Sequence, residues 1–401
     1  MPASSYPSST TPTVWRHIGL LWLVGVLAAA QLGKFAALSS VIRTDLSLSL
    51  VGTGWLVSLI ETGGASLGLV AGLLIGRWGS RRALIGGLSL LTVAGLAEGL
   101  SATALPLFAC RIIESAGYLA IVIAAPSLIA TIARPKDQAA ALTLWSTFVP
   151  VGFAIGMGLS GAGLLITGWS NILLAWGLIA AMVMAGCLRT TLPEVRTPGC
   201  FVVAGRPAWL LSIGFGFYTL VFVGLLALLP VYLNERIGLT PTLAATATGI
   251  ASATTLVGAA VAAVVVQREA VLGRWVAMTL GLLVPAGLSG LVFGGGAPLA
   301  TIGAIFILFA ISGIPSSIVF ARLPRMTGRD GQPPAVAAAN GVLTQFGAGG
   351  SLIGPPILAF VVDHWGWRAL ATAVLAGLCA CLVMTIWADK LAHSNRERAQ
   401  R

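Results

Sequence analysis

Charged residues are scarce in this chain of 401 residues, where Lys, Arg, Asp and Glu together make up only 9%. Soluble domains contain about 25% charged residues, so the composition argues against a soluble protein. Histidine is rare too: the three histidines all lie at the ends of apolar segments, and the five cysteines form no CxxC pair. The sequence therefore predicts no disulfide framework, no metal site and no cofactor.

Motifs of catalysis and of nucleotide hydrolysis are also missing. The chain contains no HExxH zinc motif, no Cys/His pair within its apolar segments and no P-loop. We therefore expect that the protein is not an enzyme and that ATP does not drive it as a pump.

Apolar sequence is abundant: 57% of the residues are hydrophobic, the mean hydropathy is +0.96, and there are 50 glycines. Runs of about 20 apolar residues can cross a hydrocarbon layer ~30 Å thick, and small residues let such helices pack closely. The sequence thus predicts an all-α membrane protein with twelve transmembrane helices, at about 17–42, 52–75, 82–103, 105–131, 139–166, 170–189, 208–233, 242–266, 275–294, 299–321, 336–361 and 366–388. The divisions at 101–106 and 168–171 are the least distinct.

Basic residues are distributed unequally between the loops. If the N-terminus is cytoplasmic and the spans alternate, 18 of the 23 Lys and Arg residues fall in cytoplasmic segments and only 3 in outer loops. This bias supports cytoplasmic N- and C-termini and an even number of spans. The net charge of +11 then reflects membrane topology rather than nucleic-acid binding. A cleaved signal peptide is the less favoured alternative, because the first apolar run continues to Ile42.

The chain has weak internal symmetry. A Gly-Arg-Trp turn follows both the second span and the eighth, and Gly152-x3-Gly156 in the fifth span matches Gly350-x3-Gly354 in the eleventh. Such offsets are typical of two six-helix halves in parallel repeat. We expect a cytoplasmic tail at 1–16, a six-helix half at 17–189, a central cytoplasmic loop at 190–207, a second six-helix half at 208–388 and a cytoplasmic tail at 389–401.

Five ionisable residues lie inside apolar runs, all in the first half: Lys34, Glu61, Glu98, Arg111 and Glu114. A charge inside a membrane is costly unless it is paired or hydrated, so such residues are candidates for function. At 1.5 Å per residue, four of them lie at similar depths of ~9–13 Å, and Glu98 is shallower at ~8 Å. These depths would let Lys34 pair with Glu61, and Arg111 pair with Glu114 or Glu98.

The loop after the second span is tight, basic and rich in glycine, with the sequence GLLIGRWGSRRAL at 72–84. It resembles the signature loop of the major facilitator superfamily, which is roughly G-x-L-x-D-R-x-G-R-R. Gly76 stands where that family has its acidic residue, so we expect any latch between the two halves to be weaker or built differently. The residues that match as a gating loop are Gly72, Arg77, Gly79, Arg81 and Arg82.

A second resemblance lies in the fourth span, where RIIESAG at 111–117 is similar to the family's R-x-x-Q-G-x-G motif. It implies a link between Arg111 and proton coupling, with Glu114 at the glutamine position. The fifth span lacks the Gly-Pro-x-x-Gly-Gly string typical of antiporters in the family. In the family's fold the first, fourth, seventh and tenth helices line a central cavity, which implies that Lys34, Arg111 and Glu114 face it and that Glu98 is peripheral.

The buried charges suggest a mechanism. Lys34 and Arg111 would attract an anionic group such as a carboxylate, which arginine can bind bidentately. Glu61 or Glu114 would carry the coupling proton, because burial favours the neutral form of a carboxylate and a nearby cation favours the charged form. The alternative is a static set of ion pairs that braces the helices. The candidate substrate-binding residues are Gln31, Lys34, Arg111 and Tyr118 in the first half and Tyr218, Phe222, Ser316, Asn340 and Gln345 in the second. For the aromatic residues of the second half, the alternative is that they pack against lipid.

The sequence thus predicts a proton-coupled secondary transporter, a monomer that moves a small, anionic organic solute across the bacterial inner membrane by alternating access. Proton-coupled efflux of drugs or metabolites and passive facilitated transport are the alternatives. An ion channel is disfavoured, because repeat symmetry and charges confined to one half suit alternating access better. The expected partners are the solute, protons and the lipid bilayer, with no nucleic acid.

Overall fold

The computed structural model describes residues 14–196, 204–267, 271–327 and 333–400. Most of the expected N-terminal tail (1–13), part of the expected central loop (197–203) and residues 268–270, 328–332 and 401 lie outside the described residues. Every regular element in the described ranges is a helix, and twelve helical segments are long and apolar enough to cross a membrane. The predicted all-α class and number of spans are therefore confirmed.

The first six spans contain more than six helices, because the second and the fifth span are each divided. The indistinct divisions of the sequence are real, since helices end at Gly99 and Gly163 and new ones begin at Ala104 and Trp169. The elements are α1 (Trp15–Asp45), α2 (Leu50–Ser58), the 3-10 turn η1 (Leu59–Glu61), α3 (Thr62–Trp78), α4 (Ser80–Gly99), α5 (Ala104–Ile132), α6 (Pro135–Ser146), α7 (Phe148–Gly163) and α8 (Trp169–Arg189).

The last six spans are continuous helices. Proline stands in the first turn of α9 and α12, where its missing N–H costs no intrahelical hydrogen bond. The elements are α9 (Arg206–Glu235), α10 (Pro241–Gln267), α11 (Val271–Phe293), α12 (Pro298–Arg322), the 3-10 turn η2 (Leu323–Met326), α13 (Pro333–Trp365) and α14 (Ala369–Gln400).

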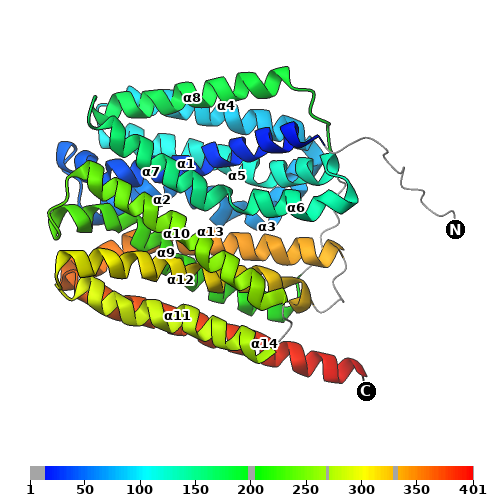
Figure 1. Cartoon of the computed structure of the whole chain (residues 1–401). Helices are drawn as coiled ribbons and strands as arrows, with labels where there is room; N and C mark the ends of the chain where they lie inside the picture. The colour runs from blue at the N-terminus through cyan, green and yellow to red at the C-terminus, as the bar shows by residue number, and fades with distance from the viewer. Residues whose placement is uncertain (1–13, 197–203, 268–270, 328–332, 401) are drawn as a thin grey trace.

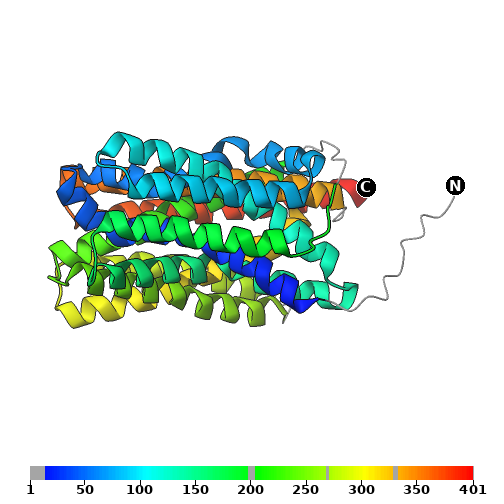
Figure 2. The same ribbon diagram turned by 90° about the horizontal axis from the view of Figure 1, so that it is seen from above.

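The helices form two groups that lie side by side (Figure 1). Residues of α1–α8 make up most of one hydrophobic core, and residues of α9–α14 make up most of a second. All the long helices run along one common direction, as the view from above also shows (Figure 2). The start of α1 and the end of α14 lie at the same end of the bundle, which we call the terminal end.

The repeated glycines mark equivalent contacts in the two groups. A Cβ atom on Gly152 or Gly156 of α7 would lie 2.4 Å from a carbonyl oxygen of α1. A Cβ on Gly350 or Gly354 of α13 would lie 2.0 or 2.3 Å from a carbonyl oxygen of α9. Each group therefore packs its first helix against its fifth span through glycines, which let the two backbones approach closely.

Contacts between the two groups occur along the length of the bundle. Helix α13 packs against α2 and α3, and α10 packs against α7. Away from the terminal end, an ion pair between Arg43 of α1 and Glu235 of α9 joins the groups. Further along α3, the Leu69 N–H donates to Gln345 Oε1 of α13 over 3.2 Å.

We expect Gly350→Leu to destabilise the protein by about 1–3 kcal/mol, because an added side chain must push α13 away from α9. Gly349→Leu is the matched control, since a Cβ on Gly349 meets no other atom within 4 Å. Thermal unfolding in detergent measures both, and equal unfolding temperatures would contradict the close α9–α13 contact.

Candidate functional site

Four of the five intramembrane charges form one cluster within the α1–α8 group. Lys34 lies on α1, Glu98 on α4, and Arg111 and Glu114 on α5. The Lys34 Nζ lies 2.5 Å from Glu98 Oε2 and 2.6 Å from Glu114 Oε1, and Glu114 Oε2 accepts a hydrogen bond from Arg111. All four side chains are 0% exposed. With both cations and both carboxylates ionised, this charge cluster is neutral and sealed from solvent.

Arg111 binds backbone carbonyl groups as well as a carboxylate. Its Nε donates to Leu56 O over 2.9 Å and its Nη2 to Val57 O over 2.7 Å, both in the second span. Its Nη1 also reaches Gln31 O of α1 over 3.1 Å. A guanidinium has five donors in a fixed planar fork, so one side chain can tie three spans together.

The second span is broken where Arg111 meets it. Helix α2 ends at Ser58, and a 3-10 turn covers Leu59–Glu61. Because a 3-10 turn shortens the hydrogen-bond spacing from four residues to three, carbonyl groups at the end of the preceding α-helix lose their usual partners. The carbonyl groups of Leu56 and Val57 stand at that position, and Arg111 supplies donors to them. The break is therefore stabilised by a charge from another helix.

Glu61, the last residue of this turn, differs from the two glutamates of the charge cluster. Its side chain is partly exposed, and no hydrogen bond or ion pair joins it to another described residue. Arg111 and Tyr118 are within electrostatic range of its carboxylate. Of the three intramembrane glutamates, Glu61 is thus the one whose carboxylate remains available.

An aromatic ring completes the surroundings of the cations. Phe35 is fully buried, and its ring centroid lies 4.6 Å from the Arg111 guanidinium carbon and 5.3 Å from Lys34 Nζ. The negative face of an aromatic ring attracts cations, most strongly where water is excluded. Sequence reasoning missed Phe35, because an aromatic residue in an apolar helix carries no sign of which partner it meets.

Two expectations about these charges are wrong. Glu98 is not peripheral to the other charges: it is fully buried and binds Lys34. The expected Lys34–Glu61 pair is not among the ion pairs of the described ranges, whereas the expected Arg111–Glu114 pair is present. Depths counted along straight helices do not decide which charges pair, because transmembrane helices are tilted by about 20° on average and also differ in rotation.

The charge cluster lacks one hydrogen-bond donor. Glu98 Oε1 is buried and has no hydrogen-bond partner among the residues that the structure describes. A buried ion-pair network is favourable only when its remaining lone pairs are satisfied, so this oxygen carries a cost. It is also the oxygen of the cluster that can take up a proton without displacing an existing hydrogen bond.

The aromatic residues of the seventh span face the protein interior, so packing against lipid is excluded for them. Phe215, Tyr218 and Phe222 are 9%, 9% and 4% exposed, and successive ring centroids lie 5.6 and 4.7 Å apart. The Tyr218 hydroxyl donates to Ser312 O over 2.7 Å and also interacts with Ser316. The structure thus brings Tyr218, Phe222 and Ser316 together on α9 and α12.

The remaining candidate residues are dispersed. Asn340 is exposed on α13, and Gln345 accepts the hydrogen bond from Leu69 at the contact between the groups. Gln31 is 1% exposed and donates to a carbonyl of its own helix. Tyr118 is partly exposed on α5, close to Glu61.

The turn between α3 and α4 is held by a segment that the sequence did not connect with it. Gly79 has φ +108°, and a Cβ there would lie 2.0 Å from Glu194 Oε1, in the segment after α8. The Ser80 N–H donates to the carbonyl of the residue after Glu194 over 2.9 Å, and Arg82 Nε lies 3.9 Å from the Glu194 carboxylate. Glu194 therefore brings a carboxylate to a turn in which Gly76 replaces the acidic residue of the family's signature loop.

The other residues of this turn make few contacts. A Cβ on Gly72 would meet no atom within 4 Å, and Arg77 is exposed. Arg81 Nε is buried and has no hydrogen-bond partner among the described residues. No ion pair joins the turn to α9–α14 in the described parts of the chain.

Replacing Lys34 with Met is expected to destabilise the protein by about 3–5 kcal/mol, because Glu98 would then be a buried carboxylate without a cation, while Glu114 keeps its ion pair with Arg111. Adding Glu98→Gln should recover part of that loss, which thermal unfolding in detergent would measure. Arg43→Gln is the control: it breaks the exposed pair with Glu235 and should cost less than ~1 kcal/mol. Equal effects of Lys34→Met and Arg43→Gln would contradict the charge cluster.

Gly79→Ala should also lower stability, by about 1–3 kcal/mol, because alanine is strained at this positive φ and its methyl group collides with Glu194. Adding Glu194→Ala would relieve the collision but not the strain, so recovery should be partial. Gly72→Ala serves as the control, since its site is open. Full recovery in the double variant would show that the backbone strain is absent.

Comparison with known proteins places the chain and its fold in a family. The family model of the Major Facilitator Superfamily matches residues 21–330. The 3-(3-hydroxy-phenyl)propionate transporter of Escherichia coli (strain K12) is 28% identical over 193 residues, which cover 47% of this chain and 46% of that protein. The Methylenomycin A resistance protein of Streptomyces coelicolor is 25% identical over 189 residues (47% and 40%), and the Cephamycin export protein of Amycolatopsis lactamdurans is 30% identical over 183 residues (43% and 37%). The matched part of the chain thus spans less than half the length of each relative.

Solved structures resemble the whole chain. A bacterial homologue of the human lysosomal transporter Spinster, in an inward-facing and occupied conformation, has a TM-score of 0.73 at 17% identity, covering 97% of this chain and 98% of its own. A D-xylose–proton symporter has a TM-score of 0.72 at 14% identity, covering 93% and 97%. At these identities the likeness establishes the twelve-helix fold alone. Because the family model spans most of the chain and the fold agrees with it, this protein belongs to the major facilitator superfamily of membrane transporters.

Proposed function

We propose that the protein is a proton-coupled secondary transporter, which moves a small organic solute of the carboxylate type by alternating access. The observation that carries this proposal is the available Glu61 carboxylate, at a helix break inside the second span. An ionised residue at such a depth is costly without a partner, and a bound proton removes the cost. Glu61 therefore has a charged and a neutral state, whose balance a bound solute can shift.

Lys34 and Arg111 are the proposed contacts of the solute's anionic group. In the present state both are engaged by carboxylates of the charge cluster. A proton on Glu114 would remove one of the negative charges that hold Lys34, and the carboxylate of a solute could then take its place. Proton and anion would enter together, and the net charge of the site would stay the same.

The second group supplies the proposed wall opposite these charges. Tyr218 and Phe222 offer apolar faces, and Ser316 offers a hydroxyl beside the Tyr218 hydroxyl. Ligand sites are lined mainly by apolar and aromatic side chains, with a few polar groups that fix orientation. We assign Gln31 and Tyr118 to the charged side of the site, and Asn340 and Gln345 to the side of α13.

Alternating access requires contacts between the groups that open at each end in turn. Away from the terminal end this contact is the Arg43–Glu235 ion pair, and nearer to it the contact is Gln345 with Leu69. Prolines within helices allow local bending, because each removes one backbone hydrogen bond. They stand within α5, α9, α11, α12 and α13 at Pro126, Pro230, Pro285, Pro315, Pro355 and Pro356.

The positive-inside bias supports a cytoplasmic location for the terminal end. We propose that the halves at 17–189 and 208–388 move as units during transport. We propose that the protein is a monomer in the inner membrane of a bacterium.

Proton-coupled efflux is the second candidate function, because two relatives are named for antibiotic resistance or export. The relative named for hydroxyphenylpropionate, itself a carboxylate, favours the first.

Proton binding linked to solute binding tests the proposal. We expect 3-(3-hydroxyphenyl)propionate, added to detergent-purified protein in weak buffer, to change the free proton concentration. Uptake of protons indicates symport and release indicates antiport. Glu61→Gln or Glu114→Gln should abolish the change while solute binding persists, and Asp363→Asn, at an exposed carboxylate on α13, should leave it intact.

Two results would contradict this function. Binding without any proton change in the unmodified protein would indicate passive transport. The uncharged amide of the solute should bind at least about tenfold more weakly, because hydrogen bonds to charged groups contribute about 1.5–3 kcal/mol. Equal affinity for acid and amide would exclude Lys34 and Arg111 as contacts of an anion.

A further inference from the structure

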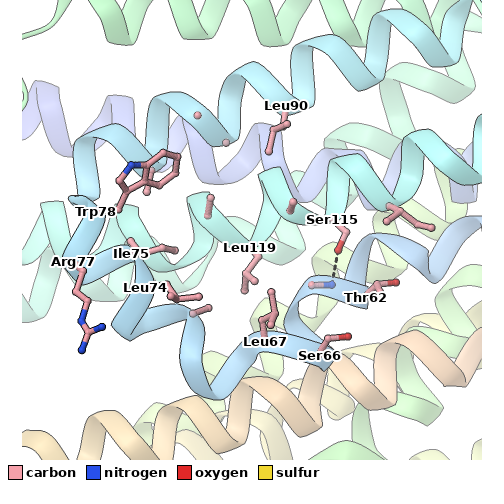
Figure 3. A pocket seen from close by; sticks show the side chains of 18 residues that line it. Thr62, Ser66, Leu67, Leu74, Ile75, Arg77, Trp78, Leu90, Ser115 and Leu119 are labelled. Carbon is pink, nitrogen blue, oxygen red and sulfur yellow. Dashed lines mark hydrogen bonds between the residues drawn. The ribbon is translucent and has the colours of Figure 1, made fainter. Parts of the chain in front are cut away.

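A lateral groove separate from the charge cluster runs between α3, α4 and α5 (Figure 3). Its volume is about 1000 Å³. Large side chains that line it are exposed, including Leu67 at 46% and Leu74 at 55%. The groove is hollow because α4 and α5 present small residues to it: Ala83, Gly86, Gly87, Ala116 and Ala120.

The groove is long enough to hold an acyl chain. From Thr62 at the helix break to Trp78 at the terminal end, α3 rises ~24 Å at 1.5 Å per residue. The hydrocarbon core of a bilayer is about 30 Å thick, so the groove begins at one membrane surface and passes the midplane. An acyl chain anchored at the terminal end would lie along its length.

The surface end of the groove carries a free cation. Arg77 lines the groove, is exposed, and forms no hydrogen bond or ion pair with the residues that the structure describes. Trp78 beside it is 59% exposed, and tryptophan is enriched at the level of lipid headgroups. Arg82, by contrast, already lies near Glu194. Arg77 is therefore the basic side chain in the groove's lining that is available to an external anion.

The inner end of the groove is closed. The Gly63 N–H donates to Ser115 Oγ, which joins α3 to α5 across the groove's end (Figure 3). Beyond Ser115, the neighbouring Glu114 points into the sealed charge cluster. Between the two ends the walls offer few polar groups that could orient a solute, whereas an acyl chain needs none.

We propose that the groove binds one acyl chain of an anionic phospholipid from the leaflet at the terminal end, with the phosphate of its headgroup at Arg77. Charge complementarity at Arg77 selects the headgroup, and burial of apolar surface along α3–α5 holds the chain. The bound chain lies against the Gly63–Ser115 contact, next to the break that positions Glu61. This proposal stands whether or not transport is coupled to protons.

Native mass spectrometry of the full chain, released from detergent, tests the proposal with phosphatidylglycerol and phosphatidylcholine as the lipids. We expect tighter binding of phosphatidylglycerol. Arg77→Gln should weaken it about fivefold, the equivalent of ~1 kcal/mol per basic residue at a membrane surface. Phosphatidylcholine should be weakened less, because its choline cation offsets the charge of its phosphate. Arg189→Gln is the matched control, since it removes an exposed arginine at the same end, outside the groove.

A second variant tests the chain-binding part of the groove. A Cβ on Gly86 would meet only the Trp78 ring, at 3.8 Å, so Gly86→Leu fills the groove without a backbone collision. It should weaken both lipids at an unchanged unfolding temperature in detergent. Unchanged lipid binding by Gly86→Leu, or an Arg77→Gln variant that behaves like Arg189→Gln, would overturn the proposal. Glycerol 3-phosphate competing as well as the intact lipid would also overturn it, by assigning an anion site without a chain.

Discussion

A charge inside a membrane must be compensated by another group of the protein, and the α1–α8 group is built around that requirement. Lys34 forms ion pairs with both Glu98 and Glu114. Arg111 binds Glu114 and also donates hydrogen bonds to backbone carbonyl groups of two other spans. Four spans thus meet at one neutral network. Because breaking one member leaves an uncompensated charge, the network sets the positions of these helices relative to one another.

The same requirement produces the feature that we connect with transport. Arg111 has more donors than the Glu114 carboxylate can use, and the surplus goes to carbonyl groups freed at the break of the second span. The break makes Glu61 the last residue of a 3-10 turn, and among the described residues its carboxylate has no hydrogen-bond partner. Arg111, whose charge is paired, thus also supports the turn that holds the carboxylate to which we assign the coupling proton.

The two groups have similar backbones and different chemistry. Glycines hold α7 on α1 and α13 on α9 in equivalent places, so the repeat is visible in the packing. The α1–α8 group carries the intramembrane charges, whereas α9 carries the neighbouring rings of Phe215, Tyr218 and Phe222. A solute between them would meet charge on one side and apolar surface on the other, which suits a small organic anion.

The sequence by itself determined the helical class, the number of spans and the two matching glycine pairs, because length, hydropathy and residue size are local properties. It also identified the five intramembrane charges, since any charge in an apolar run stands out. It did not determine which charges pair: Glu98 was assigned to the periphery and Lys34 to Glu61. Pairing depends on helix tilt and rotation, which arise only when all the spans pack together.

Tertiary structure alone decided the remaining features of the site. The break before Glu61 needs donors from Arg111, about 50 residues away in the chain, and the ring of Phe35 gains its role only from the cations that it meets. Likewise, the carboxylate at the α3–α4 turn comes from Glu194, far from the motif that lacks it. Each of these contacts joins segments distant in sequence, and no local pattern records such a partner.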